Sequence, residues 1–202
     1  QCILRLAQLG QNSDGLIVLD YREESLLFKL HLKPTLTDSA EIQIAKQTLE
    51  ILSRYNIPLN RLTIDATGQG RGLADVIRLE ARSAISPIKI YSVGQVGFKQ
   101  KTEDLIVKSS YELWFAFRDF IQYQQIAGLD KKAAWQLSHR KTIKKNGKIQ
   151  LESKQEYKKN MISAHPTMSH SPDEADAAAL CLQSAILTLG FTPGQVLPIR
   201  ST

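Results

Sequence analysis

Residues 61–77 read RLTIDATGQGRGLADVI, so an apolar run ends at Asp65 and a glycine-rich turn leads into a helix-like segment. This pattern predicts a buried strand over 61–66 and a helix from the turn to about residue 82. Because strand-like and helix-like stretches alternate on both sides of it, we expect an α/β chain with a mixed β-sheet flanked by helices. Ligands bind such sheets at the carboxyl ends of strands, which makes Asp65 a candidate site residue. The alternative is that Asp65 only caps the turn.

The other elements follow from hydrophobic periodicity, helix caps and turn residues. Asp38 with Glu41 is a capping box for one helix, and Ser171 followed by Pro172 starts another. Asn146-Gly147 between two alternating runs predicts a β-hairpin over 142–151. We expect one domain over 1–190 and a C-terminal tail over 191–202. The predicted strands are 2–6, 15–20, 25–32 and 88–93, and the predicted helices are 39–55, 103–122, 131–137 and 172–189.

Composition narrows the class of protein. The 202 residues carry a formal net charge of +6, which favours polyanionic partners. The sequence has neither the apolar run of a membrane span nor a signal peptide at its start, so we expect no membrane partner. Its two cysteines, Cys2 and Cys181, lie far apart, which points to the cytoplasm, a reducing compartment. It begins without Met, and we expect it to be a piece of a longer protein.

A second group of acids opens the last helix, where residues 171–176 read SPDEAD. Asp173 and Asp176 are three positions apart and share a face of that helix. The alanines at 177–179 would let the helix pack close to a sheet and carry its first turn toward Asp65. Carboxylates without a His or Cys cluster suit Mg²⁺ or Mn²⁺, and two such ions catalyse phosphodiester cleavage. The alternative is that these acids only interact favourably with the helix dipole.

Two stretches carry a family resemblance. The segment IDATGQGRGLADVI (64–77) resembles the second acidic motif of the nuclease domain of tailed-phage large terminases, and the segment from LESKQEYKKNM to SPDEADAAAL (151–180) resembles the third. The resemblance implies an RNase H-like fold and an endonuclease with two Mg²⁺ or Mn²⁺ ions that cuts concatemeric double-stranded DNA during packaging. It implies an ATPase motor domain before this one, a portal protein and a small terminase subunit as partners, and the host cell cytoplasm. By position, Asp65 is the second acid, Asp173 the third and Asp176 an additional or alternative ligand.

The first motif departs from the family pattern. Its acid should lie in ILRLAQLG (3–10), where the matching position falls on Ala7 or Gln8. Asp14 or Asp20 could replace it as a metal ligand. If neither does, the chain is a catalytically weakened RNase H-like DNA-binding domain. A dinucleotide site is a third reading, but the glycines at 68, 70 and 72 do not match G-x-G-x-x-G.

The predicted hairpin and the residues after it are strongly basic. Phosphate contacts by lysines supply affinity for DNA that is independent of sequence and sensitive to salt. The alternative is a solvated hairpin whose lysines prevent edge-to-edge pairing. We favour DNA contact, because a packaging nuclease should cut with little sequence preference. The expected DNA-binding residues are Lys141, Lys144, Lys145, Lys148 and Lys154.

Overall fold

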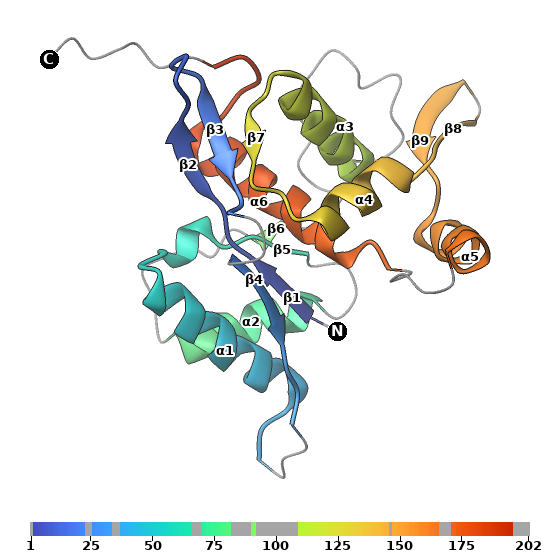
Figure 1. The fold of residues 1–202 in the computed structure, drawn as a ribbon. Helices are drawn as coiled ribbons and strands as arrows, with labels where there is room; N and C mark the ends of the chain where they lie inside the picture. The colour runs from blue at the N-terminus through green and yellow to red at the C-terminus, as the bar shows by residue number, and fades with distance from the viewer. Residues whose placement is uncertain are drawn as a thin grey trace, which may run out of the picture.

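The computed structural model describes residues 2–22, 26–33, 37–65, 70–81, 90–91, 109–145, 147–165 and 171–195 (Figure 1). Its architecture is mixed α/β, as predicted. The strands are β1 (Cys2–Arg5), β2 (Gln8–Gln11), β3 (Ile17–Asp20), β4 (Leu27–Leu30), β5 (Ile64–Asp65), β6 (Ile90–Tyr91), β7 (Ile126–Ala127), β8 (Thr142–Lys145) and β9 (Lys148–Leu151). The helices are α1 (Ala40–Arg54), the 3-10 turn η2 (Leu59–Arg61), α2 (Gly70–Glu80), α3 (Ser109–Gln122), α4 (Lys131–His139), α5 (Lys154–Ala164) and α6 (Asp173–Leu189).

Strands β1 to β4 form a long, interrupted hairpin. Strand β2 pairs antiparallel with β3, and β1 pairs antiparallel with β4. Between the two pairs, Leu6 N donates to Leu26 O at 2.9 Å. Strand β7, which the sequence did not reveal, adds to β3 in parallel. The described strands thus form separate small sheets, β1–β4, β2–β3–β7, β5–β6 and β8–β9.

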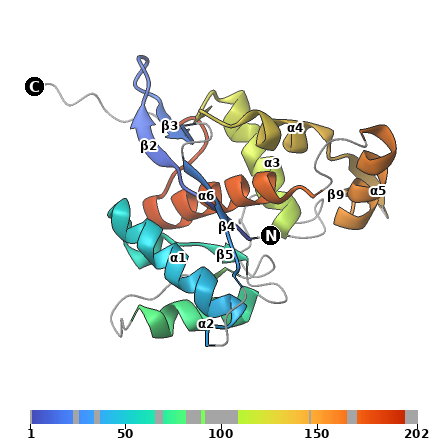
Figure 2. The ribbon, with the colours of Figure 1, turned by 60° about the horizontal axis from the view of Figure 1, so that its bottom comes forward.

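Helix α6 runs through the middle of the molecule in both ribbon views (Figures 1 and 2). The predicted alanine stripe is in the core, with Ala178 and Ala179 at most 1% exposed. Small side chains allow close backbone approach, and Tyr21 donates its hydroxyl hydrogen to Ala178 O at 2.7 Å. At Cys181 the thiol donates to Arg5 O at 3.0 Å. These contacts fasten the N-terminal hairpin to the last helix.

Helices α1 and α2 lie together on one side of α6, next to β5 and β6 (Figures 1 and 2). Their apolar faces share a core cluster that includes Leu52 and Ile77. The N-cap of α1 is Ser39, whose Oγ accepts from Ile42 N at 3.3 Å. The predicted cap, Asp38, instead forms an ion pair with Lys46 at 2.8 Å. The cap therefore lies one residue later than predicted.

The chain from α3 to α5 lies on the other side of α6. Strands β8 and β9 form the predicted hairpin. Helix α5 was not predicted; it begins with a capping box between Ser153 and Glu156 and buries only Tyr157 and Met161. Across the described residues, none of the helices combines the length and the apolar character needed to cross a bilayer.

The packed body extends past residue 190, where we predicted a tail. Gly190 ends α6 with φ 67°, a left-handed conformation that glycine adopts without strain. Phe191 is 1% exposed and packs on Phe120 with ring centroids 4.5 Å apart. Ile17 N donates to Gln195 O at 3.2 Å, so β3 is attached to the segment after α6.

Candidate functional site

Three acids, Asp173, Glu174 and Asp176, lie in the first turn of α6. Pro172 is the N-cap, one residue later than predicted, and no side chain caps the helix. Ser171 instead donates its hydroxyl hydrogen to Asp173 Oδ1 at 2.6 Å. This bond orients the half-buried Asp173 carboxylate. No other side-chain partner of Asp173 is present among the described residues.

Asp176 is engaged on both carboxylate oxygens. Its Oδ1 accepts from Trp114 Nε1 at 3.2 Å and lies 3.7 Å from Arg140 Nη1. Its Oδ2 forms an ion pair with Lys154 Nζ at 2.5 Å. The Arg140 guanidinium also lies over the Trp114 ring, 4.7 Å from its centroid. Asp176 thus joins α3, the start of the hairpin and α5 to α6.

A second carboxylate, that of Glu152, stabilises the same region. Glu152 is 3% exposed and accepts from Lys141 N at 2.7 Å and from Asn160 Nδ2 at 2.8 Å. Tyr157 is fully buried, and its hydroxyl has no hydrogen-bond partner among the described residues. Burial, with the negative charge of Glu152 nearby, raises the pKa of Tyr157 to about 12. The phenol therefore remains neutral and can donate a hydrogen bond.

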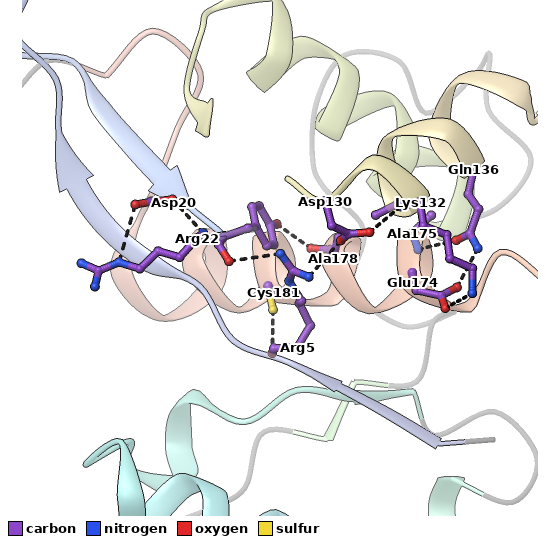
Figure 3. Close-up of polar contacts among 12 residues, drawn as sticks. Arg5, Asp20, Arg22, Asp130, Lys132, Gln136, Glu174, Ala175, Ala178 and Cys181 are labelled. Carbon is purple, nitrogen blue, oxygen red and sulfur yellow. Dashed lines mark hydrogen bonds and ion pairs between the residues drawn. The ribbon is translucent and has the colours of Figure 1, made fainter. Parts of the chain in front are cut away.

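Glu174 is a buried acid that the sequence marks only as part of the start of the last helix. It is 2% exposed, forms an ion pair with Lys132 and accepts from Gln136 Nε2 at 2.6 Å (Figure 3). Burial acts to raise the pKa of Glu174, but the hydrogen bonds from Lys132 and Gln136 outweigh it and the pKa is lowered. Gln136 Oε1 also accepts from Ala175 N at 2.9 Å. Glu174 therefore anchors α4 on α6.

Asp65 ends β5, which pairs in parallel with β6, so it occupies the predicted carboxyl end of a strand. Ser184 Oγ donates to Arg61 O at 2.7 Å, which fixes the start of this segment beside the second half of α6. Asp65 follows four residues after Arg61, and Asp173 lies 11 residues before Ser184, about 16 Å along the helix. In Figure 1 the end of β5 and the start of α6 lie toward the same side of the molecule. The glycine-rich turn at 66–69 lies outside the described residues.

Two of the first-acid candidates lie in the N-terminal hairpin, Ala7 between β1 and β2 and Gln8 at the start of β2, away from the first turn of α6. Ala7 follows Arg5, whose carbonyl meets Cys181, and it packs against the cluster that contains the second half of α6. Gln8 is exposed and pairs in register with Asp20. Cys181 itself is about 12 Å along the helix from Asp173. The structure therefore does not bring position 7 or 8 to Asp173.

The two candidate replacements, Asp20 and Asp14, also lie away from the first turn of α6. Asp20 is ion-paired with Arg22 at 3.6 Å, and Figure 3 separates it from Glu174 along α6, with Ala178 and Cys181 between them. Asp14 lies in the turn before β3, whose start meets Gln195 beyond the end of α6. A helix of 17 residues is about 25 Å long, so Asp14 and Asp173 lie at opposite ends of it.

The predicted metal ligands differ in how well they fit a hard cation. Asp65 and Asp173 are half-buried carboxylates, the donor type that Mg²⁺ and Mn²⁺ prefer. Asp176 fits less well as it stands, because two cationic side chains already occupy its oxygens. Within the described residues, no three His, Cys, Asp or Glu side chains come together as a metal-binding group.

The basic hairpin forms over the predicted residues 142–151, with Thr142 opposite Leu151 and Lys145 opposite Lys148. Lys141 and Lys144 are exposed, whereas the side chains of Lys145 and Lys148 lie outside the described part of the structure. Lys154 is 48% exposed at the start of α5 and also contacts Asp176. The hairpin and the first turn of α6 are therefore connected through Lys154 and Arg140.

No protein-family model matches the chain, and no curated protein matches it significantly. Any functional assignment must therefore rest on the residues described above and on their geometry.

Proposed function

We propose that this chain is a divalent-metal-dependent endonuclease domain of the large-terminase type, with an RNase H-like fold, that cuts double-stranded DNA. The observation that carries the proposal is the placement of Asp65 and Asp173. Asp65 ends a parallel strand, and the bond from Ser184 to Arg61 attaches the 3-10 turn η2, which precedes that strand, to α6, whose first turn carries Asp173. This arrangement supports a site where acids from two distant segments meet.

The chain's own residues would perform distinct tasks in this reaction. Asp65 and Asp173 would hold Mg²⁺ or Mn²⁺, and Ser171 would orient Asp173. Two such ions, when bound, supply Lewis-acid activation for phosphodiester hydrolysis. The exposed Lys141 and Lys144 would neutralise DNA phosphates without reading sequence. An ATPase motor domain, a portal protein, a small terminase subunit and the host cytoplasm belong to the same proposal.

Cleavage of supercoiled plasmid in millimolar Mn²⁺ tests the proposal. Asp65→Asn and Asp173→Asn keep the shape of the side chains and should each abolish nicking, because an amide binds a hard cation much more weakly than a carboxylate. Asp75→Asn is the matched control: Asp75 is exposed on α2, pairs only with Arg78 among the described residues, and should cut normally. Equal nicking by all three variants would refute the assignment.

A second candidate function is a DNA-binding domain that keeps this fold without the chemistry. It is favoured by the ion pairs of Asp176 with Arg140 and Lys154, and by the distance of the first-acid candidates from Asp173. Such a domain would bind duplex DNA without needing Mn²⁺. Its Asp65→Asn variant would bind DNA as the unmodified chain does, and neither would nick plasmid.

A further inference from the structure

The position of Lys154 is not explained by the helix that contains it. Lys154 is the first residue of α5, directly after the N-cap Ser153. A cation at a helix N-terminus is disfavoured by the helix dipole. The capping box needs Ser153 and Glu156 but not a lysine. The contact that accounts for Lys154 is its ion pair with Asp176 on α6.

Lys154, Asp176 and Arg140 form a charged cluster, and their side chains differ in solvent exposure. The side chain of Lys154 is 48% exposed, whereas that of Asp176 is 23% exposed and that of Arg140 is 7% exposed. Lys158 and Lys159 extend the exposed basic surface along α5. A polyanion that approaches this surface therefore meets Lys154 before it reaches Asp176.

The cluster also contains a buried donor that its present arrangement leaves unused. The Tyr157 hydroxyl is buried without a hydrogen-bond partner among the described residues. Buried polar groups in native proteins are nearly always hydrogen-bonded, so this phenol is a donor available to a water, an ion or a rearranged neighbour. Its neighbours include Glu152, Arg140 and Asp176, whose charges act on the phenol.

We propose that Lys154, backed by Arg140, is a DNA-operated latch on Asp176. Without DNA, the two cations occupy the carboxylate and repel a divalent ion. A DNA phosphate that binds Lys154 removes one of these charges from Asp176, which then becomes a metal ligand beside Asp173. This inference rests on the proposed nuclease function and adds its regulation by substrate. It requires DNA and metal to strengthen each other's binding by the same factor.

The latch is tested by Mn²⁺ affinity without DNA, measured from the electron paramagnetic resonance signal of free Mn²⁺. Lys154→Met keeps the length of the side chain but removes the charge, and should tighten Mn²⁺ binding at least about tenfold, because a unit charge a few ångströms from the ligand is removed. Lys154→Arg should behave as the unmodified chain. Lys158→Met, on the exposed face of the same helix, should also leave the affinity unchanged. Equal affinity in Lys154→Met and the unmodified chain, whether tight, weak or undetectable, would overturn the latch.

The opening of the latch can also be measured directly, without metal. Trp114 donates to Asp176 and stacks with Arg140, so its fluorescence reports on the cluster. In a Trp135→Phe background, a short duplex DNA should change this fluorescence in the unmodified chain and in Lys29→Met, an exposed lysine of β4, but not in Lys154→Met. A response of equal size in all three would contradict the latch.

One further variant separates the two proposals. If Asp65→Asn binds Mn²⁺ as tightly as the unmodified chain while Lys154→Met still binds it more tightly, the metal site at Asp65 is refuted and the latch stands. If Asp65→Asn weakens Mn²⁺ binding while Lys154→Met has no effect, the metal site stands and the latch is refuted.

Discussion

The two ends of helix α6 are held by different kinds of interaction. At its start, Glu174 and Asp176 bind cationic, amide and indole side chains from α3, α4, the residue after α4 and α5. At its end, Gly190 turns the chain and Phe191 packs against Phe120 in the core. Apolar contacts do not depend on a competing ion, whereas charged contacts can be exchanged for others. The comparison indicates that the end of α6 anchors the helix, while its start can respond to a ligand.

The largest loss of stability is expected from the apolar end. Phe191→Ala removes a buried ring and should lower the free energy of unfolding by about 3–5 kcal/mol. Leu189, which is 44% exposed at the same helix end, provides the control. Leu189→Ala should change stability by less than about 0.5 kcal/mol. Urea denaturation of both variants measures this, and equal losses would show that Phe191 is no anchor.

The next largest effect concerns the departure at the first acidic motif. Ala7 packs against the core, so Ala7→Asp should cost about 1–3 kcal/mol of stability by burying a carboxylate. It should not increase plasmid cleavage, because position 7 lies away from Asp173. Asp14→Asn and Asp20→Asn should likewise leave cleavage unchanged. A gain of orders of magnitude in Ala7→Asp would restore position 7 as the first-acid site.

A smaller, pH-dependent effect is expected at the charged end. The lowered pKa of Glu174 means that its stabilisation is complete above the unfolded-state pKa and is lost as pH falls through the folded-state pKa. Glu174→Gln should therefore lose about 1–2 kcal/mol near neutral pH and progressively less in acid. Glu50→Gln, with a side chain 68% exposed, is the control and should show little loss at any pH. Thermal melts between pH 3 and 7 measure the difference.

Lysine replacements in the hairpin should have the smallest effect on the stability of the fold, but they should have a clear effect on DNA binding. Replacing Lys144, Lys145 and Lys148 together with Ala should flatten the slope of log affinity against log salt by up to about 3. Stability should change little. The control triple variant has Ala at Lys29, Lys33 and Lys46, which removes the same charge from another part of the chain. It should keep most of the slope of log affinity against log salt. Fluorescence anisotropy with duplex DNA at several salt concentrations distinguishes the two triple variants.

Local patterns were sufficient to predict several elements. The periodic helices α1, α4 and α6 and the Asn-Gly hairpin are where the sequence predicts them, with ends that differ by a residue or two. Helix α5 was missed because its periodicity rests on Tyr157 and Met161 in a mostly polar stretch. The capping box of Ser153 and Glu156 was a usable signal for it.

The partners of the acids could not be read from local patterns. Glu174 pairs with Lys132, 42 positions earlier in the chain, and Trp114 donates to Asp176 across 62 positions. No periodicity links such residues, because their meeting depends on how α4 and α3 pack on α6. The sequence therefore identified Asp176 as an acid in a suitable place but not the cations that hold it.

The attachment of the first strand to the last helix also constrains the order in which the chain can fold. Cys181 bonds to Arg5 across 176 positions, and Tyr21 bonds to Ala178 across 157. Contacts this far apart close late and make folding slow. During synthesis the N-terminal hairpin cannot pack on α6, and its apolar face stays exposed, until α6 has left the ribosome. Nascent chains halted at residue 170 should thus be cleaved by protease throughout the hairpin, and protection should appear only once α6 is available.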